Sequence, residues 1–348
     1  MEAVSGTPAS FKDFTALYKE MVYGKICEYL PDGEPEEHSK AVRTYVDRKG
    51  QYRRPSYLLL WTLLYNGDIK EAILPAAIQQ VSEDWILIID DWMDGNTLRR
   101  GQPAAQVIFG DRYAINAASN LQAVNWRMAK DAMVSLGTDR GNRYFEKFYD
   151  MIEVTHRGQY IDLNLTHDVK DITKFTLDDY YKSIFAKSAY YTVFGPMQQG
   201  AIIAGADQEK VAKIQEYGTP IGNAFQIKDD ILDCTSTEDV LGKSIGNDVR
   251  EGTKTLILWH AVNNAPTNVL ARLKEIYSKK RGDKSDQDVK FVLDTFTELG
   301  SIDNAQKKAD ELTLTAQNKF DEIENDITES GIKELARESI GYVAKRSK

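Results

Sequence analysis

The sequence predicts an all-α protein, and three observations support this fold class. Long segments carry apolar residues three and four positions apart, which is the period of an amphipathic helix. Alternating apolar and polar runs bounded by turn pairs, the usual sign of strands, are hard to find. The chain of 348 residues contains only 9 prolines, and most of them stand near apparent helix starts or in loops.

The helical pattern is clearest in residues 73–94, 114–136, 210–233 and 303–327. Loops are expected where the periodicity stops, at residues 30–37, 95–103, 167–173 and 235–253. Residues 279–288 are polar and charged, so we expect them to be exposed. Because no segment resembles an interdomain linker, we predict a single domain over residues 1–348, with peripheral helices from about residue 289.

Composition narrows the function classes. Hydrophobic residues make up 42% and charged residues 28%, which is typical of a soluble globular protein. No apolar run reaches 18 residues, so no membrane span is expected. The N-terminus lacks the pattern of a secretion signal, and Cys27 and Cys234 lie far apart, so we expect a cytoplasmic protein without a disulfide. A net charge of −9 argues against nucleic acid as a partner.

Two similar acidic segments carry the functional argument. Each has the pattern D-D-x-x-D at the end of a strongly apolar helical stretch. The first aspartate cluster comprises Asp90, Asp91 and Asp94, and the second comprises Asp229, Asp230 and Asp233. Basic residues follow both clusters: Arg99 and Arg100 follow the first, and Lys243 follows the second.

The spacing of the aspartates favours a metal site. Residues four apart lie on one helix face with Cβ atoms roughly 6 Å apart, and two like charges there destabilise a helix by a few tenths of a kcal/mol. A divalent cation removes this repulsion, and Mg²⁺ usually takes one or two carboxylates together with substrate phosphates. A single cluster fits a solvated acidic face equally well, whereas two copies after apolar runs favour Mg²⁺ ions that hold a diphosphate between them.

Over roughly residues 50–258, the sequence resembles trans-isoprenyl diphosphate synthases of the polyprenyl synthetase family. Residues 90–103 (DDWMDGNTLRRGQP) look like the family's first aspartate-rich motif, and residues 225–233 match F-Q-x-x-D-D-x-x-D. Other matches are Gly158-Gln159 with Asp162-Leu163, Lys187-Ser188, and Gly242-Lys243 with Gly246 and Asp248.

The resemblance implies a single helical domain around a deep central cavity, usually as a homodimer. It implies that Asp90, Asp94 and Asp229 bind Mg²⁺, with three ions in all, and that Asp91, Asp230 and Asp233 support the site through waters or outer contacts. It further implies that Arg99, Lys187 and Lys243 bind the allylic diphosphate, that Arg54 and Arg100 bind the homoallylic diphosphate, and that Gln226 and the backbone of Lys187-Ser188 face the allylic cation.

Three positions depart from the family pattern. Gln51 stands where a lysine would bind isopentenyl diphosphate, and Glu83 stands where a histidine or glutamine is usual. Thr253 replaces an expected lysine, with Lys254 next to it. The changes at residues 51 and 83 reduce the positive charge of the homoallylic site. A carboxylate beside a diphosphate is unfavourable unless it is protonated, paired or turned away.

The resemblance therefore implies condensation of isopentenyl diphosphate with an allylic diphosphate. In the family the cavity floor lies just before the first aspartate cluster, where Trp85 and Ile86 stand. The bulk of Trp85 favours a C15–C20 product, unless this side chain faces the core or a dimer interface.

Three other functions stay open. A class I terpene synthase would ionise an allylic diphosphate without adding isopentenyl diphosphate, and Gln51 and Glu83 favour it modestly. A regulatory subunit of an active synthase would be free to lose aspartates, yet all six are present. Generic calcium or anion binding does not account for both clusters with their arginines.

Overall fold

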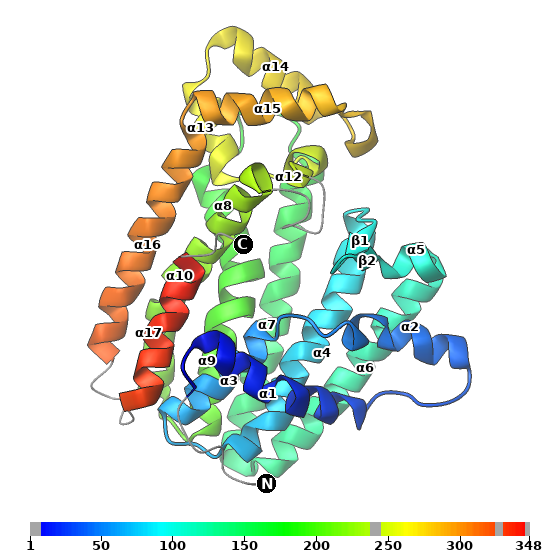
Figure 1. Ribbon diagram of the computed structural model, residues 1–348, viewed down its shortest axis with the longest axis vertical. Helices are drawn as coiled ribbons and strands as arrows, with labels where there is room; N and C mark the ends of the chain where they lie inside the picture. The colour runs from blue at the N-terminus through cyan, green and yellow to red at the C-terminus, as the bar shows by residue number, and fades with distance from the viewer. Residues whose placement is uncertain (1–7, 237–244, 324–329, 345–348) are drawn as a thin grey trace. The chain divides into compact units, whose positions relative to one another are not determined.

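The computed structural model describes residues 8–236, 245–323 and 330–344, and nearly all regular structure in them is helical (Figure 1). The all-α prediction is confirmed. The chain forms two compact units. Unit 1 takes residues 1–150, 195–215 and 320–339, and unit 2 takes residues 151–194, 216–319 and 340–348. The single-domain organisation stays a prediction.

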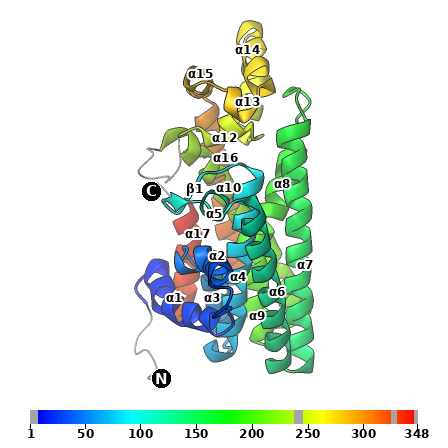
Figure 2. The same ribbon diagram turned by 90° about the vertical axis from the view of Figure 1, so that its right-hand side faces the viewer.

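Unit 1 is built around one long helix, α4 (Ile69–Met93). Helices α1, α2, α3, α5, α6 and α9 all pack against it. Figures 1 and 2 show α6 beside α4. The elements of unit 1 are α1 (Phe11–Cys27), α2 (Glu36–Asp47), α3 (Arg53–Leu64), α4, β1 (Leu98–Arg99), β2 (Gln102–Pro103), α5 (Ala105–Phe109), α6 (Asp111–Ser135) and α9 (Gly195–Ile203), with parts of α7 (Thr138–Leu163) and α10 (Gln208–Thr235), the end of α16 (Ser301–Ile323) and most of α17 (Ser330–Ala344).

The ends of α4 follow from local sequence. The Asp68 side chain accepts a hydrogen bond from the backbone N–H of Lys70 and caps the N-terminus. The helix ends at Met93, because Gly95 adopts a φ of +67°, a conformation that glycine reaches without strain. By length and composition α4 is able to cross a membrane, but 72% of its most apolar window is buried inside the structure, as in a core helix.

Unit 2 holds the second half of α7 and most of α10, together with shorter helices. Helix α8 packs against the π-helix η2, and α15 packs against α12, α13 and α14. Its other elements are η1 (Asn164–Asp168), α8 (Leu177–Ile184), η2 (Phe185–Phe194), α12 (Asn247–Glu251), α13 (Leu256–Asn264), α14 (Thr267–Ser278), η3 (Arg281–Asp283), α15 (Asp286–Glu298), most of α16 (Ser301–Ile323) and the end of α17 (Ser330–Ala344).

Two of the predicted loops contain regular structure. Residues 95–103 form a two-stranded hairpin, and residues 235–253 contain α12. The prediction that residues 279–288 are exposed is wrong in part. Lys284 and Asp288 are buried, because Lys284 donates to the carbonyl of Arg250 and Asp288 accepts from Arg272 and Lys279. Cys27 and Cys234 do not form a disulfide.

A glycine sets the contact between α3 and α9. A Cβ atom on Gly200 would lie 2.2 Å from the carbonyl oxygen of Leu58 and 2.9 Å from the backbone nitrogen of Thr62. These are backbone atoms of α3, so they cannot move aside without shifting the helix.

We therefore expect Gly200→Ala to lower the free energy of unfolding by about 2–3 kcal/mol, since the added methyl group forces the two helices apart. Urea unfolding measures this change. Gly24→Ala is the matched control, because Gly24 lies inside α1 with nothing within 4 Å of its Cβ position. It should stabilise the protein by about 0.5–1 kcal/mol. Equal effects at the two sites would contradict the packing argument.

Candidate active site

The first aspartate cluster lies where α4 ends. Asp90 occupies the last turn of the helix and Asp94 is its C-terminal cap, with the N–H of Asp94 donating to the carbonyl of Asp90 at 2.9 Å. Both side chains are partly exposed. This end of α4 therefore carries two neighbouring carboxylates that solvent ions can reach.

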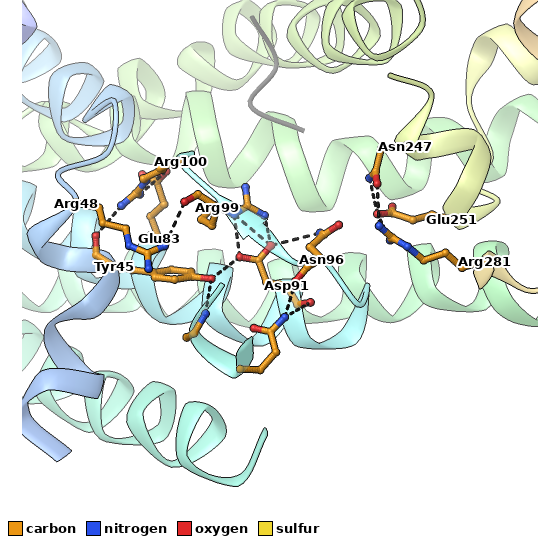
Figure 3. A network of polar contacts seen from close by, with 12 residues as sticks. Tyr45, Arg48, Glu83, Asp91, Asn96, Arg99, Arg100, Asn247, Glu251 and Arg281 are labelled. Carbon is orange, nitrogen blue, oxygen red and sulfur yellow. Dashed lines mark hydrogen bonds and ion pairs between the residues drawn. The ribbon is translucent and has the colours of Figure 1, made fainter. Parts of the chain in front are cut away.

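Asp91 points the other way and is completely buried. Its carboxylate accepts a hydrogen bond from the Tyr45 hydroxyl at 2.6 Å and from Asn96 at 3.3 Å (Figure 3). Arg99 donates through Nε at 2.9 Å and also through Nη2, so the pair is a bidentate ion pair. Burial alone would lower the pKa of Arg99, but the hydrogen bond and charge of Asp91 raise it. Asp91 thus fixes Arg99.

The hairpin after α4 positions the two arginines differently. Leu98 pairs with Pro103 and Arg99 with Gln102, which leaves a two-residue turn of Arg100 and Gly101. Both turn residues have positive φ, +53° and +72°, as a type I′ turn requires. Arg99 therefore lies on a strand, whereas Arg100 lies in a conformation that is uncommon outside glycine.

Arg48, the C-terminal cap of α2, holds this hairpin in place. Its guanidinium donates to the carbonyl oxygens of Arg99 at 3.1 Å and Pro103 at 2.7 Å. It also lies over the ring of Tyr45, 5.0 Å from the centroid. Gln106 adds hydrogen bonds to the carbonyl oxygens of Asp91 and Asn96 at 3.0 and 2.6 Å. The aspartate and the hairpin are thus parts of one polar network.

A second polar group surrounds Glu83. Its carboxylate lies 3.0 Å from Nη1 of Arg54 and 3.7 Å from Nη2 of Arg100, so the unusual glutamate is paired. Burial would raise the pKa of Glu83, but the charges of Arg54, Arg100 and Arg53 outweigh it and lower the pKa. Gln51 is exposed.

Asp84 is the buried neighbour of Glu83. It lies 3.0 Å from Nη2 of Arg100 and accepts from Gln80 at 3.2 Å, while only 1% of its surface is exposed. Burial raises the pKa of Asp84 to about 7, with the charge of Glu83 adding to the rise and that of Arg100 opposing it. Within the described part of the chain, its second oxygen finds no hydrogen-bond partner.

Gly50 leaves the space that Arg100 occupies. A Cβ atom on Gly50 would lie 2.4 Å from Nη2 and 2.8 Å from Cζ of Arg100. The other guanidinium nitrogen, Nη1, donates to the carbonyl of Tyr45 at 2.7 Å. This packing gives Gly50, which directly precedes Gln51, a physical role.

The second aspartate cluster, in unit 2, has a similar internal arrangement. Asp229 is partly exposed, whereas Asp230 is 4% exposed and points inward. Asp230 accepts from the Tyr180 hydroxyl at 2.8 Å and from Gln226 at 2.9 Å, and Gln226 accepts from Ser188 at 2.6 Å. Burial raises the pKa of Asp230 to about 7; the two hydrogen bonds oppose this shift.

Asp233 of the same cluster anchors α12. It is 1% exposed, and its carboxylate accepts the backbone N–H of Asp248 at 3.0 Å. The carbonyl of Asp233 also accepts the N–H of Gly246 at 2.9 Å. Helix α12 is further held by Arg281, which donates to Glu251 and Asn247 at 2.7 and 2.9 Å (Figure 3).

Lys187 lies on the π-helix η2, next to Ser188. Its ammonium group lies 2.8 Å from the carboxylate of Asp162, and both side chains are about one-third to one-quarter exposed. A π-helical turn widens the helix and often occurs at functional sites. Asp162 belongs to the G-Q-x-x-D-L segment, so the structure joins two of the sequence motifs.

Lys254 is 5% exposed and donates to the carbonyl of Gly252 at 2.8 Å. Burial, followed by the charges of Lys284 and Lys170, lowers its pKa to about 8. Lys254 and Lys284 both lie 5.5 Å from the ring centre of Tyr277. Lys243 lies outside the described residues, so its role stays a prediction.

Trp85 is 1% exposed and points toward α6, where its indole N–H donates to Asn125 at 3.4 Å. Asn125 in turn donates to the carbonyl of Ile78 at 2.9 Å. Ile86, the next residue, is partly exposed. The role of both residues in limiting product length stays a prediction.

The donor set is compatible with Mg²⁺ that is shared with a substrate. Among the described residues, no three acidic, histidine or cysteine side chains converge as a metal-binding group. Mg²⁺ is usually held by one or two carboxylates, with phosphate and water oxygens completing the coordination. Asp90 with Asp94, and Asp229 in unit 2, supply such partial sets.

Sequence reasoning missed the residues that orient the aspartates. Tyr45 comes from α2, Arg48 caps the C-terminus of that helix, Gln106 comes from α5 and Tyr180 from α8, and no motif marks any of them. Asp84 carried a signal, because an acidic residue next to Glu83 within an apolar helix is unusual.

The raised pKa of Asp84 has a measurable consequence. Its carboxyl binds a proton more tightly in the folded than in the unfolded protein, so the stability that it contributes is present below about pH 4 and is lost as pH rises through about 7. Asp84→Asn stays neutral. We compare the free energy of unfolding of Asp84→Asn with that of the unmodified protein. The difference, variant minus unmodified protein, should increase by about 1–3 kcal/mol between pH 5 and pH 8. Urea unfolding at both pH values measures this; a constant difference would contradict it.

Comparison with known proteins agrees with these motifs. A family model described as polyprenyl synthetase matches residues 35–296. The short chain isoprenyl diphosphate synthase of Methanothermobacter thermautotrophicus is 29% identical over 313 residues, covering 90% of this chain and 92% of that protein. The geranylgeranyl diphosphate synthase of Methanosarcina mazei is 31% identical over 298 residues, covering 85% and 87%.

Solved structures give the same result. The geranylgeranyl pyrophosphate synthetase of Pyrococcus horikoshii superposes with a TM-score of 0.83 at 28% sequence identity, and the match covers 97% of this chain and 99% of that one. The family model spans well over half of the chain and includes both aspartate clusters. The chain therefore belongs to the polyprenyl synthetase family.

Proposed function

We propose that this chain is a Mg²⁺-dependent short-chain trans-prenyltransferase. It condenses isopentenyl diphosphate with an allylic diphosphate and releases a C15–C20 prenyl diphosphate and pyrophosphate. The observation that carries the proposal is the pair of D-D-x-x-D clusters, each with a partly exposed first aspartate and a buried second one, in a member of this family. Relatives named geranylgeranyl and farnesyl synthases support the substrate class.

The proposed roles of the site residues are metal binding and diphosphate binding. Asp90, Asp94 and Asp229 would hold up to three Mg²⁺ ions, which neutralise the charge of the departing diphosphate when bound. Arg99, Lys187 and Lys243 would supply positive charge toward the allylic diphosphate, and Arg54 and Arg100 toward the homoallylic one.

The chemical step needs no covalent enzyme intermediate. The allylic C–O bond breaks and its electron pair leaves with the diphosphate. The π electrons of isopentenyl diphosphate form the new C–C bond to the allylic cation, and a proton is then lost to the released diphosphate. The protein contributes positioning and electrostatic stabilisation. We further propose that the enzyme is a cytoplasmic homodimer, in line with its family resemblance.

Product analysis tests the function directly. The purified chain is incubated with Mg²⁺, labelled isopentenyl diphosphate and a C5, C10 or C15 allylic diphosphate. We expect labelled C15 or C20 diphosphates, and no product after removal of Mg²⁺ by a chelator. Unlabelled hydrocarbons from the allylic substrate alone would indicate a terpene synthase, and complete inactivity would favour a regulatory subunit.

Trp85→Ala tests the product-length prediction. If the indole limits chain length, its removal should shift the products from C15–C20 toward longer chains, as measured by chromatography of the hydrolysed products. Trp61→Ala is the matched control, because Trp61 is an equally buried tryptophan of unit 1. It should cost stability to a similar degree, about 3–5 kcal/mol, without changing product length. Equal distributions in all three proteins would remove Trp85 from the cavity floor.

A further inference from the structure

The arginines assigned to the homoallylic diphosphate are already paired with carboxylates of the protein. Arg54 lies 3.0 Å from Glu83, and Arg100 lies 3.0 Å from Asp84 and 3.7 Å from Glu83. All of these residues belong to unit 1. Their side chains are largely buried, with exposed fractions from 1% for Asp84 to 18% for Arg100. We call Arg53, Arg54, Arg100, Glu83 and Asp84 the arginine cluster.

Charge in the cluster is unbalanced. Three arginines face Glu83, namely Arg53 and Arg54 at the start of α3 and Arg100 on the hairpin turn. The acidic side consists of Glu83 and Asp84 from α4. Neutral groups also contact the cluster: Gln80 donates to Asp84, the Tyr45 carbonyl accepts from Arg100, and Tyr52 is buried nearby. Lys19 and Arg48 add positive charge near Arg100, and Glu20 adds negative charge near Tyr52. With Asp84 partly protonated near neutral pH, positive charge exceeds negative charge.

A carboxylate and a phosphate compete for the same arginine geometry. The guanidinium group offers a planar fork of N–H donors that matches either anion with two parallel hydrogen bonds. Arg54 is bound by Glu83 in this structure, so an incoming diphosphate must displace Glu83 or accept a like charge beside it. Like charges in contact at a partly buried site are strongly unfavourable.

Contacts other than the one with Glu83 hold Arg100 in place. Nη1 of Arg100 donates to the Tyr45 carbonyl at 2.7 Å, and its guanidinium fills the space above Gly50. The Asp84 contact also remains. Loss of the Glu83 charge should therefore leave Arg100 in place and make the arginine cluster more positive.

We propose that Glu83 is a specificity-determining residue that competes with the diphosphate of isopentenyl diphosphate for Arg54 and Arg100. This inference rests on the proposed function, because it takes the cluster as the homoallylic site. Glu83 then weakens the binding of isopentenyl diphosphate and leaves the allylic diphosphate unaffected. The enzyme needs a higher concentration of isopentenyl diphosphate than it would with a neutral residue at this position.

Glu83→Gln tests the proposal, because it removes the charge and keeps the shape of the side chain. Binding of isopentenyl diphosphate to the full chain is measured by titration calorimetry, and KM for both substrates is measured in the condensation assay. We expect Kd and KM for isopentenyl diphosphate to fall on the order of tenfold, with KM for the allylic substrate unchanged.

Glu71→Gln is the matched control. Glu71 lies at the other end of α4 and pairs with Arg140 at 2.7 Å, so the variant also breaks a glutamate–arginine pair on the same helix. It should leave both KM values unchanged. Glu83→His is a second variant for the case that Glu83→Gln folds poorly. It also removes the fixed negative charge, so it should also tighten the binding of isopentenyl diphosphate.

An unchanged or higher Kd for isopentenyl diphosphate in folded Glu83 variants would overturn the inference, because Glu83 would then be a structural pair or a ligand. The binding measurement does not depend on turnover. If neither the unmodified protein nor any variant forms a condensation product, the proposed function is overturned. Tighter binding of isopentenyl diphosphate without turnover would still support the role of Glu83.

Discussion

A buried carboxylate needs hydrogen bonds or an opposite charge, and this constraint organises both aspartate clusters. Moving an unpaired charge out of water costs several kcal/mol. Asp91 meets the constraint with Tyr45, Asn96 and Arg99, and Asp230 meets it with Tyr180 and Gln226. In each helix the second aspartate lies about 100° around the axis from the first, so it turns inward while the first stays at the surface. The middle aspartates therefore act as anchors that fix the ends of α4 and α10.

The same constraint links the anchors to the basic residues. Asp91 holds Arg99 on the hairpin, and the hairpin turn places Arg100 against Glu83 and Asp84. In unit 2, Asp233 fixes the start of α12, and Gln226 ties Asp230 to Ser188 beside Lys187. Each cluster thus combines at least one partly exposed carboxylate, suited to a metal ion, with buried carboxylates that fix neighbouring residues. A substitution of Asp91 would therefore act on the position of Arg99.

Sequence reasoning recovered the long helices because they carry many periods of the apolar pattern. Helices α4, α6 and α10 lie within four residues of their predicted bounds at each end. It missed the hairpin and α12, because elements of two and five residues contain too little pattern. It named the six aspartates and noticed Glu83, but not Tyr45, Tyr180 or Gln106, because those contacts join residues 15 to 50 positions apart. The burial of Lys284 and Asp288 was also unexpected, since local polarity does not reveal long-range pairing.

A crystal structure with Mg²⁺ and diphosphate would test the central claim most directly. The account predicts ions at about 2.0–2.1 Å from carboxylate oxygens of Asp90 and Asp94 in the first cluster and of Asp229 in the second, shared with diphosphate oxygens. Asp91 would remain paired with Arg99, and Asp230 with Tyr180. Ions bound instead by Asp91 or Asp230, or diphosphate bound without any contact to an aspartate-held ion, would contradict it.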